Sequence, residues 1–275
     1  MAMLPNPLPA LAGDPTGQAL GLDLPPGALV DETIDGTWHE PLLWCADAPA
    51  VPGDWRQLLP ARRTAGLHPV LIGSAGSQGG RPEKWDLNPQ GTTYAGDHDA
   101  EEVLAEVWEA YAQDELSGEL ADGAAPVGPW PGLAPPGSSD YDPDGEAAEL
   151  ADILTLGDSW LGDPRLALVP ARRSADIPAA IGWSGPLNFE DDVARLSAVL
   201  RSWEDRFGVR VVALTFDQLV VSVAAPPTTM EAAEALAVEH FAFCPDNIQQ
   251  GAHPALSAYA KHRIIDQPTW SFWWD

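Results

Sequence analysis

The sequence has 275 residues, 45% of them hydrophobic, and its 41 acidic and 14 Lys and Arg residues give a formal net charge of −27. This length and apolar content suffice to bury a core, which excludes a chain disordered throughout. The negative charge would repel a phosphate backbone, so nucleic-acid binding is not expected. Because no apolar run approaches a membrane span and the N-terminus does not resemble a leader peptide, we expect a cytoplasmic protein without membrane contact.

The acidic residues are concentrated in the first half of the chain. Residues 1–144 hold 23 acidic and 5 basic residues, whereas residues 145–275 hold 18 and 9. Such a potential could attract a basic protein partner and steer its approach, or it could serve only to keep the protein soluble.

The first half predicts an irregular arm followed by an α/β region. Residues 1–36 are rich in Pro, Gly and Asp, which favours an arm without regular structure. Residues 37–122 form the expected N-terminal α/β region. Its predicted elements are strands Thr37–Ala46 and His68–Gly73 and helices Asp54–Leu59 and Asp97–Leu116.

The helix predicted over Asp97–Leu116 is strongly acidic. Its apolar residues recur at helical spacing, from Val103 to Trp108 and Tyr111. Ten acidic residues and no Lys or Arg lie between Asp97 and Asp122. Acidic residues near the C-terminal end of a helix oppose its dipole, so the acidic face is either a binding surface or a solvated face kept at some cost.

The second half is expected to be a separate domain. Residues 123–143 are rich in Pro, Gly and Ser and predict a linker, and residues 144–275 form the C-terminal domain. Its predicted elements are, in order, a helix over about 144–156, strands Leu166–Val169 and Ala179–Trp183, a helix capped by Asn188 and ending at Phe207, strands Val209–Thr215 and Gln218–Ala224, a helix opened by the capping box Thr228–Glu231, a short helix Pro254–Ile264 and a strand near the C-terminus.

These elements predict an α+β fold. In the C-terminal domain the order β-α-β-β-α-β is that of the ferredoxin-like split motif, with residues 245–267 inserted before the last strand and with the acidic α/β half preceding it. The sequence leaves open whether the two halves share one sheet.

Several C-terminal motifs together are similar to those of a known family. They are Leu200–Gly208, Ala225–Pro227, Glu239–Asp246, Gln250–Gly251 and Trp270–Asp275. As a set they resemble the bacterial domain-of-unknown-function family 4253, in the form typical of actinobacteria. The resemblance covers about residues 165–275 and implies a small cytoplasmic bacterial domain, without an activity or a catalytic residue.

One group of residues could carry chemistry. His240 and Cys244 are four residues apart and share a helix face if the helix reaches Cys244, so the imidazole could activate the thiol, with Asp246 or Glu239 orienting the histidine. His240, Cys244 and His253, with Asp246, could instead bind a metal ion. The third interpretation places Cys244 in the core, as a reduced thiol far from the second cysteine, Cys45.

The C-terminal aromatic residues allow two interpretations. In a strand, Trp270, Phe272 and Trp274 share one face, while Trp273 points the other way. The three either close the core or form an aromatic binding surface, to which Gln249, Gln250 and Asn247 could contribute.

Two functions are compatible with these features. The first is a non-catalytic, acidic protein-binding module that engages a basic protein partner, as an immunity protein or antitoxin does when it neutralises a toxin. The alternative is a hydrolase-like enzyme that uses Cys244 and His240. Neither hypothesis requires a cofactor, and both leave the oligomeric state open.

Overall fold

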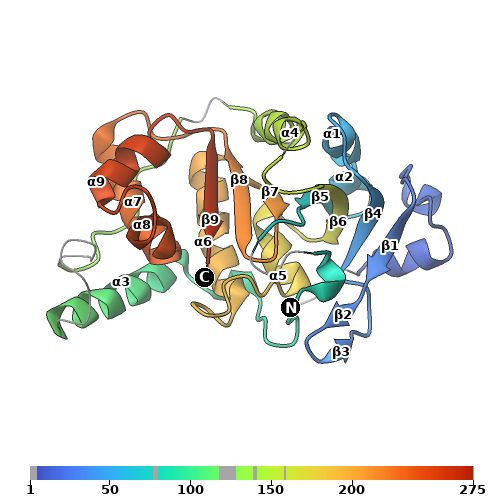
Figure 1. Ribbon diagram of the computed structural model, residues 1–275, viewed down its shortest axis with the longest axis horizontal. Coiled ribbons are helices and arrows are strands. Elements are labelled where there is room, and N and C mark those ends of the chain that lie inside the picture. The colour runs from blue at the N-terminus through green and yellow to red at the C-terminus, as the bar shows by residue number, and fades with distance from the viewer. Residues whose placement is uncertain (1–4, 77–79, 118–127, 139–140, 158, 275) are drawn as a thin grey trace.

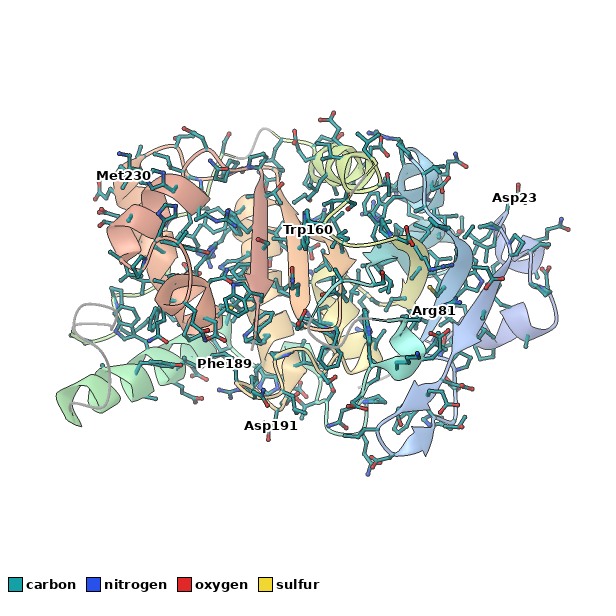
Figure 2. All side chains as sticks on the ribbon, in the orientation of Figure 1. Asp23, Arg81, Trp160, Phe189, Asp191 and Met230 are labelled. Carbon is teal, nitrogen blue, oxygen red and sulfur yellow. The ribbon has the colours of Figure 1, made fainter. Side chains whose placement is uncertain are left out.

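We describe the fold from a computed structural model, which defines residues 5–76, 80–117, 128–138, 141–157 and 159–274, with the side chains of 113–117 excluded. The protein is a mixed α+β structure built on a seven-stranded sheet (Figure 1). The molecule extends across the strands of this sheet, with Asp23 near one end and Met230 near the other (Figure 2).

The sheet has the strand order β1-β4-β6-β5-β7-β8-β9, and a separate small hairpin joins β2 and β3. Neighbouring strands are antiparallel except for β5 and β7, which are parallel. The strands are β1 (Gly27–Val30), β2 (Glu32–Thr33), β3 (Gly36–Thr37), β4 (Leu43–Pro49), β5 (Leu67–Ile72), β6 (Arg165–Pro170), β7 (Val209–Leu214), β8 (Gln218–Val223) and β9 (Thr269–Trp273).

Both faces of the sheet are buried, because helices cover each of them. Along β5, Val70 and Ile72 point into one apolar cluster, and Leu67 and Leu71 point into the other, as the two-residue period of a strand requires. The first cluster is covered by α3 (Ala100–Ser117), α5 (Ile177–Ile181), α6 (Val193–Phe207) and α7 (Met230–Phe243). The second is covered by η1 (Leu8–Ala12), α1 (Asp54–Leu58), α2 (Ala61–Thr64) and α4 (Pro143–Leu154).

The remaining helices are short. Beside β9 lie α8 (Asp246–Gln249), α9 (Leu256–Tyr259) and the π-helical turn η6 (Ala260–Ile264), and the loops hold η2 (Gln18–Leu20), η3 (Pro82–Lys84), η4 (Ala95–Asp97) and η5 (Ser174–Asp176). Among the helices that the described residues form, none combines the length and apolar character needed to cross a bilayer.

The strand order corrects the expected ferredoxin-like split motif. In that motif the last strand lies beside the first, but here the last strand, β9, pairs with β8 at the edge of the sheet. The first strand of the C-terminal half, β6, pairs with β4 and β5 instead. Strand β5, from the N-terminal half, separates β6 from β7, so the two halves share one sheet.

The predicted strand Ala179–Trp183 is wrong, because this segment forms helix α5. Pro178 stands in the first turn of α5, where its fixed φ suits a helix. Gly182 ends the helix with a φ of 63°, and a Cβ there would lie 2.2 Å from the backbone nitrogen of Pro89. The short length of the segment hid its helical character.

Other boundaries differ from the expected ones by a few residues. Asp192 rather than Asn188 caps α6, and Thr229 rather than Thr228 caps α7. The predicted strand Thr37–Ala46 is divided, since Thr37 ends β3 and the long strand β4 begins only at Leu43, after Pro41.

The expected irregular arm, residues 1–36, is more regular than its composition suggests. Its described part contains η1, η2, β1 and β2. Leu8 and Leu11 are buried in the second apolar cluster, and β1 extends the sheet through β4. These long-range contacts order a segment whose local sequence favours turns.

The described part of the expected linker, residues 128–138, packs onto the helices. The backbone N–H of Ala134 donates to Glu239 at 2.7 Å, and its carbonyl accepts a hydrogen bond from Arg206 at 2.9 Å. The indole of Trp108 donates to the carbonyl of Gly128 at 3.1 Å. This segment therefore connects α3 to α6 and α7.

Candidate functional site

His240 lies on α7 at the centre of an aromatic cage and is completely buried. Its ring centroid is 4.6 Å from that of Trp270, 4.9 Å from Trp203 and 5.0 Å from Phe272. Its Nδ1 shares a hydrogen bond of 3.2 Å with the hydroxyl of Tyr259. Burial, helped by the positive charges of Arg263 and Arg206, lowers the pKa of His240 to about 3, so the imidazole is neutral.

Cys244 follows the last turn of α7 and is also completely buried. Its Sγ donates to the carbonyl oxygen of Trp273 at 3.0 Å and to Oδ1 of Asn247 at 3.5 Å, whereas the ring of His240 turns to Tyr259. Burial raises the pKa of the Cys244 thiol far above its ordinary value. A thiol with a raised pKa stays protonated near neutral pH, which disfavours it as a nucleophile.

The structure does not bring His240, Cys244 and His253 together as the metal interpretation requires. Within the part of the chain that the structure describes, no three His, Cys, Asp or Glu side chains gather closely enough to hold a metal ion. His253 instead stacks on His262, with the ring centroids 4.5 Å apart. Asp246, the proposed orienting residue, accepts a hydrogen bond from Gln250 at 2.8 Å.

The aromatic residues of β9 close the core. Trp270, Phe272 and Trp274 are at most 3% exposed, so they cannot form the binding surface considered above. Trp203 of α6 stacks on Phe272 with centroids 5.5 Å apart. Gln249 and Gln250 lie at the end of α8, where Gln249 is half-buried and Gln250 is exposed. Trp273 points to the other face of the strand and remains partly exposed.

Asn247 of α8 covers the outer edge of β9, where none of the described strands pairs with it. Its Nδ2 donates to the carbonyl of Ser271 at 2.7 Å and to the hydroxyl of Tyr259 at 3.3 Å. Its Oδ1 accepts the backbone N–H of Trp273 at 3.2 Å and the thiol of Cys244. The amide thus pairs with the strand as a peptide group would, and this blocks addition of another strand.

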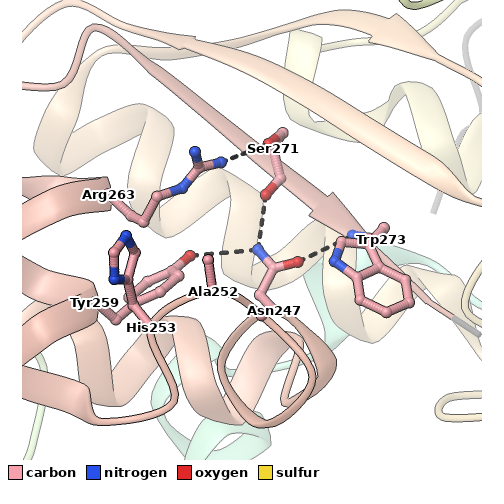
Figure 3. Close-up of a pocket in the computed structure, with 8 residues that line it drawn as sticks. Asn247, Ala252, His253, Tyr259, Arg263, Ser271 and Trp273 are labelled. Atoms are coloured by element: carbon pink, nitrogen blue, oxygen red, sulfur yellow. Dashed lines mark hydrogen bonds between the residues drawn. The ribbon is translucent and has the colours of Figure 1, made fainter.

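A pocket of about 210 Å³ opens beside this edge. In Figure 3, Arg263, His253 and Tyr259 lie on one side of it, Ser271 and Trp273 on the other, and Asn247 between them. Gly251 and Ala252 complete the lining. Arg263 donates to the hydroxyl of Ser271 at 3.2 Å, so the guanidinium joins η6 to β9 at the pocket.

The sequence analysis missed Arg263, Tyr259 and Ser271 as pocket residues. One signal could have pointed to this region, because residues 247–265 contain no Asp or Glu in a chain of net charge −27 and carry Lys261, His262 and Arg263 in succession. The pocket is therefore lined largely by a stretch that lacks acidic residues in an otherwise acidic protein.

Helix α3 presents acidic residues to solvent. Glu101, Glu102, Glu106 and Glu109 are exposed, whereas Trp108 packs edge-on against Phe241 of α7. Helix α3 packs against α6 and α7, and Figure 1 shows it at the lower left of the molecule. The amphipathic pattern recognised in the sequence thus places the carboxylates of these four residues on the surface.

Many of the arginines form ion pairs with carboxylates of the same chain. The guanidinium of Arg201 binds both carboxylate oxygens of Asp176, and that of Arg206 binds both oxygens of the buried Glu239. Further pairs join Arg62 to Asp144, Arg173 to Asp205, Arg195 to Glu190 and Glu106, and Arg210 to Asp144 and Glu204. Because these positive charges are paired, the potential outside the molecule is set largely by the remaining carboxylates.

Comparison with known proteins gives one match. No curated protein and no solved structure matches the chain. The matched region begins at β6 and includes α6, α7, the pocket and the aromatic cage, while β1, β4, β5 and α3 lie outside it. Residues 165–275, the C-terminal part of the chain, match the family described as Domain of unknown function (DUF4253), the family that the sequence motifs resemble.

Proposed function

We propose that this protein is a non-catalytic binding module that recognises a basic protein through the acidic face of α3, in the manner of an immunity protein or antitoxin. The observation that carries the proposal is the exposure of Glu101, Glu102, Glu106 and Glu109 on one helix of a protein with net charge −27. Of these four, Glu106 forms an ion pair with Arg195.

The physical basis is long-range attraction. A surface of one charge sign speeds the encounter with an oppositely charged protein, and the effect weakens as salt screens it. Helix α3 is also held firmly, because Val103, Leu104 and Trp108 are buried against the first apolar cluster. A rigid helix presents its carboxylates without a large entropic cost on binding.

The test is a pair of charge-reversal variants with the same change in net charge. In the first, Glu102→Lys and Glu109→Lys reverse two exposed positions on α3. In the matched control, Glu146→Lys and Glu149→Lys reverse two exposed positions on α4, which covers the opposite face of the sheet. A partner recovered from the native host at low salt is purified, and its affinity for each form is measured at two salt concentrations.

We expect the α3 variant to bind the partner at least tenfold more weakly than the control, and binding by the unmodified protein to weaken as salt is raised. Equal weakening in both variants would show that only net charge matters. Recovery of no cationic partner at low ionic strength would also contradict the proposal.

The alternative, a thiol- and histidine-dependent enzyme, receives less support. The Cys244 thiol donates to the carbonyl of Trp273, and its raised pKa keeps it protonated. His240 bonds to Tyr259 within the aromatic cage. A catalytic pair of this kind needs the base within hydrogen-bond reach of the nucleophile and a route for substrate.

A further inference from the structure

The pocket beside β9 has a chemical character opposite to that of the rest of the protein. Its side chains come from α8, the loop after it, α9, η6 and β9. The acid-free stretch 247–265 supplies Arg263 and His253, and Lys261 and His262 adjoin them in sequence or by ring stacking. On a protein of net charge −27, the pocket lining thus contains an arginine and no carboxylate.

Two of the polar residues that line the pocket are already committed to the structure. Asn247 uses both amide hydrogens and accepts two hydrogen bonds at its oxygen. The hydroxyl of Tyr259 is shared between Asn247 and Nδ1 of His240. These groups hold the wall in place rather than contact a ligand.

The groups left for a ligand are mainly hydrogen-bond donors. Arg263 has five N–H groups, and the hydroxyl of Ser271 accepts from one of its terminal nitrogens. Within the described parts of the chain, no carboxylate forms an ion pair with Arg263. A planar guanidinium with free donors matches a carboxylate or phosphate, which accepts two parallel hydrogen bonds.

Size and charge narrow the choice of ligand. Pockets for drug-sized ligands have volumes of roughly 300–1,000 Å³, so a pocket of about 210 Å³ takes a smaller molecule. The surrounding negative charge disfavours a dianion such as a phosphate monoester more than a monoanion. The partly exposed indole of Trp273 offers a flat apolar wall on the side opposite Arg263 (Figure 3).

We propose that this pocket binds a small monocarboxylate with a flat, apolar body, whose carboxylate pairs with Arg263 while the body packs on Trp273. His253 and Ser271 lie on either side of the carboxylate position and complete its hydrogen bonds. This site is separate from the acidic face of α3, and the proposal does not depend on the partner inferred for that face.

Three probes test the ligand class on the full chain by ligand-observed NMR titration at about 0.15 M salt, where weak surface electrostatics is screened. Benzoate carries the proposed features, benzamide has the same shape without the charge, and inorganic phosphate, a mixture of monoanion and dianion near neutral pH, is an anion without the flat body. We expect benzoate to bind saturably with a Kd of about 1 mM or below, and at least tenfold more tightly than either of the other two.

Two variants with the same loss of charge then locate the site. Arg263→Gln removes the proposed partner of the carboxylate, and Arg56→Gln removes another exposed arginine, on α1. We expect benzoate binding to weaken at least tenfold in Arg263→Gln and to stay unchanged in Arg56→Gln. Arg263→Lys should give an intermediate affinity, because it keeps the charge but loses the paired donors.

Several results would overturn the proposal. They are the absence of saturable benzoate binding, equal binding of benzamide and benzoate, tighter binding of phosphate than benzoate, and equal effects of the Arg263 and Arg56 substitutions. Thermal unfolding of each variant shows whether it is folded, which we expect because both arginines are exposed.

Discussion

Glu239 is the buried carboxylate that joins the linker segment to the C-terminal helices. It is completely buried on α7 and accepts hydrogen bonds from the indole of Trp203 at 2.8 Å and from the backbone N–H of Ala134 at 2.7 Å. Both terminal nitrogens of Arg206 also donate to it, at 2.8 and 2.5 Å. Replacing Glu239 with Gln keeps the side-chain shape but removes the charge and places an NH2 group against donors.

The size of the effect follows from these contacts. Removing one partner of a buried ion pair costs about 3–5 kcal/mol, because the other charge remains buried without compensation. The side chain of Arg206 is 14% exposed, so water can relieve only part of this cost. At about 2–4 °C for each kcal/mol in proteins of 150–250 residues, Glu239→Gln should lower the melting temperature by roughly 10 °C.

Thermal unfolding followed by circular dichroism, with urea unfolding as a second measurement, gives this difference. Glu102→Gln is the matched control, since the same chemical change on the exposed face of α3 should shift stability by no more than about 0.5 kcal/mol. A melting temperature for Glu239→Gln within about 2 °C of the unmodified protein would refute the reasoning.

Two further predictions concern buried titratable groups. Burial raises the pKa of Cys244 far above its ordinary value and that of Cys45 to about 11. Both thiols should therefore react with iodoacetamide near pH 7.5 much more slowly in the native than in the urea-unfolded protein. Rapid alkylation of Cys244 in the native protein would instead favour the enzyme hypothesis. His240 has a folded pKa of about 3, below the unfolded value near 6.5, so the unfolded chain binds the extra proton and stability falls as pH drops through this window. At pH 4.5 the protonation of this group in the unfolded chain should lower the free energy of unfolding by about 3 kcal/mol relative to neutral pH. In His240→Phe the free energy of unfolding should therefore decrease less steeply as the pH is lowered. An unchanged slope would contradict a buried, neutral imidazole.

The helices and the β7–β8 hairpin could be predicted because their signals are local. Val193, Leu196, Leu200 and Trp203 recur at helical spacing, and all are buried in α6. The carboxylates of α3 were placed on its exposed face for the same reason. Helix α5, by contrast, is too short for periodicity to distinguish it from a strand.

The sheet order could not be predicted, because a local pattern shows that a strand is buried without identifying its neighbours. Strand β5 lies between β6 and β7, although almost a hundred residues separate it from β6 in the chain. The contacts that select this pairing are long-range, and the free energy of burying both faces of the sheet outweighs the entropy of closing such a loop.

In the candidate site, too, the local features were predictable from the sequence and the long-range contacts were not. The sequence spaces His240 and Cys244 four residues apart, but whether they cooperate depends on what surrounds them. Tertiary packing buries both residues in the core, where the thiol bonds to the carbonyl of Trp273 and the imidazole bonds to the hydroxyl of Tyr259. Burial also lowers the pKa of His240 and raises that of Cys244, which disfavours an imidazolium and a thiolate near neutral pH. The sequence by itself thus determined residue types, charge and helical faces. The tertiary structure decided which groups are exposed to water and which contact each other, because desolvation and pairing depend on atoms brought together from distant parts of the chain.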